Sequence, residues 1–359
     1  MKRFLAAALL LTLLSTGVCY GVNLTSTATA ESNTVSVSLD TIQQLWMDHS
    51  LDYAKLQSDL AVSKKTYSEV SKSLDRADEN GLDSLLNSLL NSRDQAKLAY
   101  DVASAQYDQK VQNGILSAKT AFLTCWQDQL NLDTARKTLA QKQDQLSRDT
   151  EALRRGYLSQ NTYDTLKDAA DELQNTVNSL STKQDLDETA LKTKLGLSLD
   201  DTIIYIFPDL SREVFADLMA KVDPSADFTA LQANSVNLKV LLITADSLSV
   251  YIRSYANSAQ VDNAKLNLKN AQDTLQASFT AQYQSLINQY TDLQNEYRKL
   301  SVEKDQLDKT QKQFDKGYVS TLALSNLNLE YSSMETGVKV KESALYSAYL
   351  SYLNMVAGN

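Results

Sequence analysis

The chain has 359 residues, but only 9 glycines and 2 prolines, far fewer than compact globular domains of this length use. Turns must therefore be few and the elements between them long. The formal net charge of −9 is spread along the chain and leaves no basic patch, which argues against binding to nucleic acid.

The first segment has the organisation of a signal peptide. Two basic residues precede an apolar run over residues 4–20, and small polar residues lead to Ala28-Thr29-Ala30. This pattern predicts a signal peptide at residues 1–30 and export of the rest. An uncleaved anchor is the alternative, because the apolar run is just long enough to span a membrane. After cleavage Cys125 is the only cysteine, expected to be a buried filler.

Residues 31–196 are predicted to form a first helical-hairpin repeat. A helix over about 38–75 comes first, followed by a long helix ending near Arg155 and a returning helix that ends at Gly196. Apolar residues recur every seventh position along the long helix, which favours coiled-coil packing. They are Leu132, Leu139, Leu146 and Leu153.

Residues 197–228 contain both prolines and are predicted to link two repeats. The run from Ile203 to Pro208 is the best strand candidate in the chain, and a buried extended linker remains an equal alternative.

Residues 229–359 are predicted to repeat the first hairpin, beginning with a helix over about 229–256. Lys316-Gly317-Tyr318 follows Arg155-Gly156-Tyr157 at a separation of 161 residues, and the apolar spacing is preserved around both. The matching seven-residue series is Leu293, Leu300, Leu307 and Phe314. The chain is therefore predicted to be all-α, with two tandem antiparallel coiled-coil hairpins and little or no β-structure.

Each hairpin turns at a glycine. Gly156 and Gly317 stand where a helix stops, a position that favours the left-handed conformation, and Ser159 and Ser320 are candidate N-caps of the returning helices. An aromatic and an aliphatic residue lie between glycine and serine in both turns. The predicted tip residues are Gly156, Tyr157, Leu158, Ser159, Gly317, Tyr318, Val319 and Ser320.

Two copies of a short helix, a long helix, a glycine tip and a returning helix resemble the TolC family of outer-membrane efflux proteins. The resemblance covers roughly residues 38–359. It implies a homotrimer with a hollow helical tunnel, located in the cell envelope. It also implies that the tips dock to a periplasmic adaptor coupled to an inner-membrane pump, as part of an efflux or type I secretion system.

The sequence departs from the family where membrane strands should lie. Residues 75–91 have helical spacing of apolar positions, and residues 253–262 leave too little room for a hairpin of strands. The expectation is a TolC-like tunnel protein that lacks the β-barrel hairpins, with attachment to the envelope without membrane insertion as an open alternative.

No pattern in the sequence favours an enzyme. His49 is the only histidine and is expected to be a polar helix-end residue, and no grouping with metal-ligand spacing or nucleotide-binding glycine pattern occurs. We expect no catalytic residue, cofactor or metal. The preferred function is a passive conduit. The alternatives are an extracytoplasmic coiled-coil scaffold without transport activity and, third, an adaptor.

Overall fold

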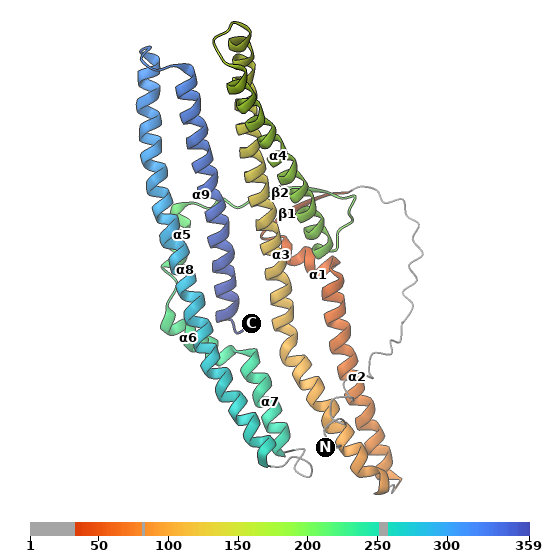
Figure 1. Cartoon of the computed structure of the whole chain (residues 1–359). Helices are drawn as coiled ribbons and strands as arrows, with labels where there is room; N and C mark the ends of the chain where they lie inside the picture. Colours follow the sequence, from red (N-terminus) through yellow and green to blue (C-terminus); the bar gives the residue numbers. More distant parts are fainter. Residues whose placement is uncertain (1–32, 81–82, 251–257) are drawn as a thin grey trace, which may run out of the picture.

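The computed structural model describes residues 33–80, 83–250 and 258–359 (Figure 1). The predicted signal peptide and residues 253–257 lie outside the described residues. The elements, in chain order, are β1 (Thr34–Ser38), α1 (Ile42–His49), α2 (Leu51–Glu79), α3 (Asp83–Arg154), α4 (Gln160–Leu195), β2 (Thr202–Ile206), α5 (Arg212–Met219), α6 (Pro224–Asn234), α7 (Val236–Val250), α8 (Ser258–Asp315) and α9 (Thr321–Val356).

Four long helices lie side by side in the order α8, α9, α3, α4 (Figure 1). The α3–α4 and α8–α9 turns are at one end of the molecule, while α2 and α7 run beside α3 and α8 at the other end. The all-α fold with two tandem hairpins is confirmed.

The predicted seven-residue series forms the seam inside each hairpin. Leu132 and Leu139 of α3 are buried against Val177 of α4, and Leu293 of α8 is fully buried. Side chains seven residues apart return to the same side of a helix, so one apolar stripe is covered along its length. Because the second seam continues into the main core while the first forms its own cluster, the hairpins are similar but not identical.

The first helix of each repeat is divided, which the sequence reading missed. The helix expected over 38–75 is α1 and α2, separated at Ser50, and the one expected over 229–256 is α6 and α7, separated at Ser235. Ser50 has an extended backbone (φ −70°, ψ 129°) and accepts a hydrogen bond from the N–H of Asp52. Such a serine stops one helix and caps the next.

A two-stranded parallel sheet lies across one face of the long helices. β1 pairs with β2 in the register Val35 with Ile203 and Val37 with Tyr205. The strand candidate at 203–208 is therefore a strand over part of its length, and β1 was not expected. Phe207, just after β2, stacks on Trp126 of α3 with ring centroids 5.3 Å apart, which fixes the sheet to the helices.

Both returning helices end in the same way. Gly196 and Gly358 have φ values of 71° and 89°, and each abuts the end of a short helix, at His49 and Asn234 respectively. A Cβ at Gly196 would lie 2.0 Å from the carbonyl oxygen of His49, so only glycine fits. The duplication thus extends to the contacts in the middle of the molecule.

Residues 75–91, expected to be helical, belong to α2 and α3 on both sides of residues 81–82. Over the part of the chain that the structure describes, no helix combines the length and the apolar character needed to cross a membrane.

Candidate functional site

The two hairpin tips have the same backbone geometry. The N–H of Gly156 donates to the carbonyl of Leu153 (2.9 Å) and the N–H of Tyr157 to that of Ala152 (2.8 Å). Gly317 and Tyr318 repeat this pair of bonds at 2.7 and 2.9 Å. With φ values of 76° and 78° at the glycines, both tips are Schellman motifs, which fix the direction in which the chain leaves the helix.

A serine starts the returning helix at each tip, as predicted. The hydroxyl of Ser159 accepts from the N–H of Thr162, and that of Ser320 accepts from the N–H of Ala323, both at 3.2 Å. The two serines satisfy backbone donors that the first helical turn leaves free. Each tip is therefore a rigid turn with defined ends.

This rigid turn holds one tyrosine in solvent. Tyr157 is 82% exposed and Tyr318 is 79% exposed, while Leu158 and Val319 are half-buried. Large exposed aromatic side chains on rigid turns are typical of contact surfaces, because they can be buried at little cost in conformational entropy. The matched exposure makes the two tips a pair of equivalent contact points.

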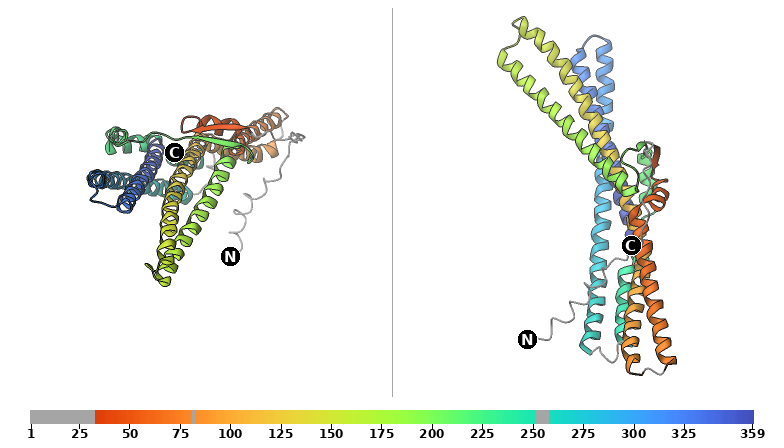
Figure 2. Two further views of the ribbon diagram at one scale, coloured as in Figure 1. Left: turned by 90° about the horizontal axis from the view of Figure 1, so that it is seen from above. Right: turned by 90° about the vertical axis from the view of Figure 1, so that its right-hand side faces the viewer.

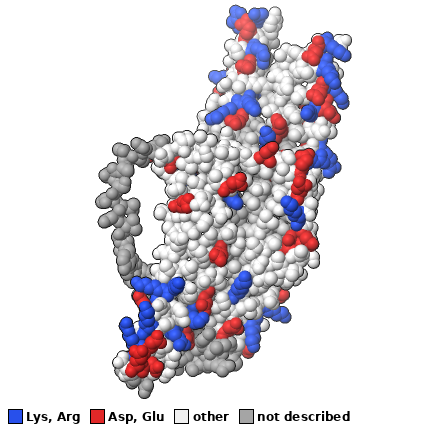
Figure 3. Space-filling view, turned by 180° about the vertical axis from the view of Figure 1, so that it is seen from behind, with Lys and Arg blue, Asp and Glu red and all other residues white. Residues whose placement is uncertain are grey.

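The electrostatics of the tips differ. Arg154 and Arg155 both donate to Glu151, with contacts of 2.6 Å, and these hydrogen bonds lower the pKa of the Glu151 carboxyl. Among the described residues, no ion pair is found for Lys316 at the second tip. Figure 3 shows basic side chains near the ends of both hairpins, whereas the middle of the face it presents has few charges.

The structure places the eight predicted tip residues in two groups at one end of the molecule but does not bring the groups together. Figure 2 shows the hairpin of α3 and α4 diverging from that of α8 and α9 toward the tips. A partner that contacts both tips must therefore bridge two hairpins.

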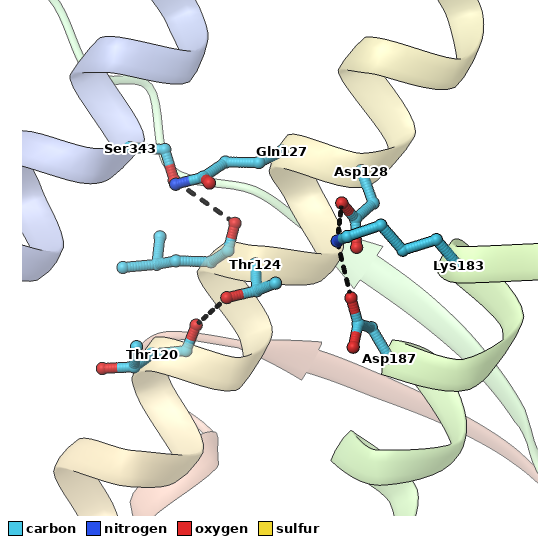
Figure 4. A network of polar contacts seen from close by, with 8 residues as sticks. Thr120, Thr124, Gln127, Asp128, Lys183, Asp187 and Ser343 are labelled. Carbon is cyan, nitrogen blue, oxygen red and sulfur yellow. Dashed lines mark hydrogen bonds and ion pairs between the residues drawn. The ribbon is translucent and has the colours of Figure 1, made fainter. Parts of the chain in front are cut away.

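A charge cluster around one buried carboxylate, between α3 and α4, was missed (Figure 4). Asp128, only 4% exposed, accepts a bond from Lys183, which also pairs with Asp187 at 2.8 Å. Burial raises the pKa of Asp128, whereas its neighbours lower that of Asp187. The signal was present in the sequence, since Asp128 lies four residues before Leu132 on an apolar stripe.

The seam between the two hairpins includes hydrogen bonds between uncharged groups. Gln127 donates to Ser343 (3.1 Å; Figure 4 shows both side chains), whose hydroxyl donates to the Leu123 carbonyl. Thr134 pairs with Thr336 at 2.8 Å. This α3–α9 seam is distinct from the leucine seams within the hairpins.

Two further residues that the sequence singles out are His49 and Cys125. His49 is exposed at the end of α1, and Cys125 is buried, which raises its pKa to about 12. In the part of the chain that the structure describes, no group of three or more His, Cys, Asp or Glu side chains is placed to hold a metal ion.

No family model and no curated protein matches the sequence. Solved structures do match. The Campylobacter jejuni CmeC outer membrane channel is 8% identical, with a TM-score of 0.63 over 93% of this chain and 90% of that one. CusC, described as forming a transmembrane channel, is 9% identical, with a TM-score of 0.60 over 91% and 94%. The open state of the Neisseria gonorrhoeae MtrE outer membrane channel is 11% identical, with a TM-score of 0.52 over 89% of each chain.

At these identities the similarity establishes the fold. The chain has the helical architecture of outer membrane channels along nearly its whole length, and the neighbours are channel proteins.

Proposed function

We propose that this protein is a TolC-like conduit of an envelope efflux or secretion system. Several copies, three by the family resemblance, surround a water-filled path. The observation that carries the proposal is the pair of matched tips at one end of a channel-like fold, each with an exposed tyrosine on a Schellman turn.

The tips are proposed to dock to an extracytoplasmic adaptor that is itself coupled to an inner-membrane pump. Residues 156–159 and 317–320 would form this surface, with Tyr157 and Tyr318 as the anchors. Equal exposure at both sites suits a partner with repeated hairpins of its own, because one type of contact can then be made twice. The protein would perform no chemistry and would need no cofactor.

The proposed organisation is a signal peptide at 1–30, a first hairpin repeat at 31–196, a linker at 197–228 and a second repeat at 229–359. The exported protein would lie in the cell envelope. A coiled-coil scaffold is the second candidate, but heptads alone do not require two equivalent tips at the same end.

The docking test replaces both anchors. The Tyr157→Asp/Tyr318→Asp variant should lose binding to the co-expressed adaptor by at least tenfold, because two charges replace aromatic contacts. Both side chains are largely exposed, so the circular dichroism spectrum of the variant should match that of the native chain. Leu199→Asp, at a residue 62% exposed and remote from the tips, is the control. Unchanged adaptor binding by the double variant would contradict the docking proposal.

A further inference from the structure

Two carboxyl groups and one ammonium group meet between α3 and α4. Lys183 of α4 pairs with Asp128 of α3 and, at 2.8 Å, with Asp187, which lies one turn further along α4. Figure 4 shows the ammonium group between the two carboxyl groups. A single ammonium group neutralises one carboxylate, so if both aspartates were ionised, one negative charge would remain uncompensated at this contact between helices.

The neighbouring titratable groups do not neutralise the second carboxyl. Cys125 and Tyr205 stay neutral, because burial raises the pKa of both. The hydroxyl of Tyr205 donates to Glu188 (3.2 Å), and Lys192 pairs with Glu188 at 2.9 Å. On its other side, α3 contacts the uncharged Ser343 of α9 (Figure 4). Among the described residues, no second cation is paired with either aspartate.

One oxygen of the buried carboxyl has no donor. Asp128 is 4% exposed, and its Oδ1 accepts from Lys183, but no donor in the described part of the chain reaches its Oδ2, which is also buried. A buried acceptor without a donor is costly, and more so when it is charged. The carboxyl of Asp187 lies within hydrogen-bonding reach. A proton on Oδ2 would remove the surplus charge and make this oxygen a donor to Asp187.

We propose that Asp128 and Asp187 share one proton and, together with Lys183, form a proton-binding site that joins α3 to α4. Asp128 is the acid, and its Oδ2–H donates to the ionised carboxylate of Asp187. Lys183 donates to both groups. Two carboxyls in such contact titrate as a pair, because the second proton is held more tightly once the first has left.

The opposite pKa directions of the two groups agree with this sharing. Burial and the contact with Asp187 raise the pKa of Asp128, whereas the bonds from Asp128 and Lys183 lower the pKa of Asp187. The raised pKa stabilises the contact at low pH and ceases to do so as pH rises through it, while the lowered pKa acts in the opposite sense at lower pH. The contact should therefore be strongest near the ordinary aspartate pKa of about 3.9 and should loosen as pH rises.

Infrared spectroscopy detects the shared proton. In a Glu342→Gln background, which removes a second buried carboxyl, the chain should keep a carboxylic-acid C=O band above the ordinary carboxyl pKa. Asp128→Asn should abolish this band. Asp187→Asn should shift its loss to lower pH by about one unit, because the new amide donates to an ionised Asp128. Asp133→Asn, at an exposed position of the same helix, is the control and should leave the band unchanged.

Hydrogen exchange tests the effect on the helices. At pH 8, the amides of α4 around Lys183 should exchange roughly threefold faster in the native chain than in Asp128→Asn, whose amide keeps its bonds to Lys183 and Asp187 at every pH. At pH 4.5, where the native pair holds its proton, the two chains should exchange alike. The amides of the α8–α9 hairpin are the internal control and should not differ between the chains at either pH.

Three results would overturn the proposal. Absence of the acid band above the ordinary carboxyl pKa would show that both aspartates are ionised. A band that Asp187→Asn leaves unshifted would show that burial alone holds the proton on Asp128. Equal exchange of the native chain and Asp128→Asn at pH 8 would show that the proton does not affect the helix contact. If Asp128→Asn fails to fold, the native band and its shift in Asp187→Asn still decide the sharing.

Discussion

At the scale of single residues, glycines with the same backbone conformation have different surroundings. Gly156 and Gly196 have φ values of 76° and 71°, but a Cβ at Gly156 would meet nothing within 4 Å, whereas one at Gly196 would clash with the backbone of His49. Position 156 favours glycine only because of its left-handed backbone. Position 196 requires glycine both for that backbone and because the neighbouring backbone of His49 leaves no room for a Cβ.

This difference predicts unequal effects of the same substitution. Gly156→Ala should lower the free energy of unfolding by about 1–2 kcal/mol, the cost of a left-handed alanine. Gly196→Ala should cost about 2 kcal/mol more, because the backbone at His49 must move. Urea unfolding followed by circular dichroism measures both. Equal losses would contradict the close contact between α4 and the end of α1.

The tip residues could be predicted because their chemistry is local. A glycine followed three residues later by a serine is sufficient to indicate a C-cap and an N-cap, and both tips form as expected. Their role in docking remains a prediction. The break at Ser50 was missed because a serine inside an apolar periodic run is also compatible with a continuous helix.

At the scale of elements, the two hairpins are held by different polar contacts. Asp128 and Lys183 join α3 to α4, whereas Tyr297 of α8 donates to Glu342 of α9, a residue only 6% exposed. Neither pair has an equivalent at the matching positions of the other hairpin, where Gln289, Ala344, Arg136 and Ser181 stand. The repeats have therefore diverged in their interior while keeping their ends.

Glu342 should make the α8–α9 hairpin sensitive to pH. Burial raises the pKa of its carboxyl, so the folded chain binds this proton more tightly than the unfolded chain. The resulting stability is full below the ordinary carboxyl pKa and is lost as pH rises through the raised one. Glu342→Gln removes this dependence and still accepts the hydrogen bond from Tyr297.

We therefore expect the urea midpoint of Glu342→Gln to rise relative to that of the native chain as the pH rises from 4.5 to 8. Glu330→Gln, at an exposed position of the same helix, is the control and should follow the native chain. A urea midpoint of Glu342→Gln that falls relative to that of the native chain as pH rises would show that the fold stabilises the buried carboxylate of Glu342.

The long helices were predictable because their periodicity is repeated over many turns, but the pairing of Asp128 with Lys183 was not. Asp128 needs Lys183 from another helix to be tolerated, and no local pattern reveals which lysine is its partner. β1 was missed for a related reason, since five residues of alternating serine, threonine and valine form a strand here only by pairing with β2, far along the chain.

At the scale of the whole molecule, the long helices of one chain form an open row rather than a closed bundle. Four long helices form a row, and both tips point the same way (Figure 1). The fold shared with outer membrane channels and the internal duplication are the basis on which we propose that copies surround a common axis.

The most direct test is the mass in solution of the chain without residues 1–30, measured by light scattering after size-exclusion chromatography. The proposed conduit predicts one species with three times the mass of a single chain, unchanged on dilution through the micromolar range. An elongated monomer throughout that range would contradict the conduit and favour the coiled-coil scaffold.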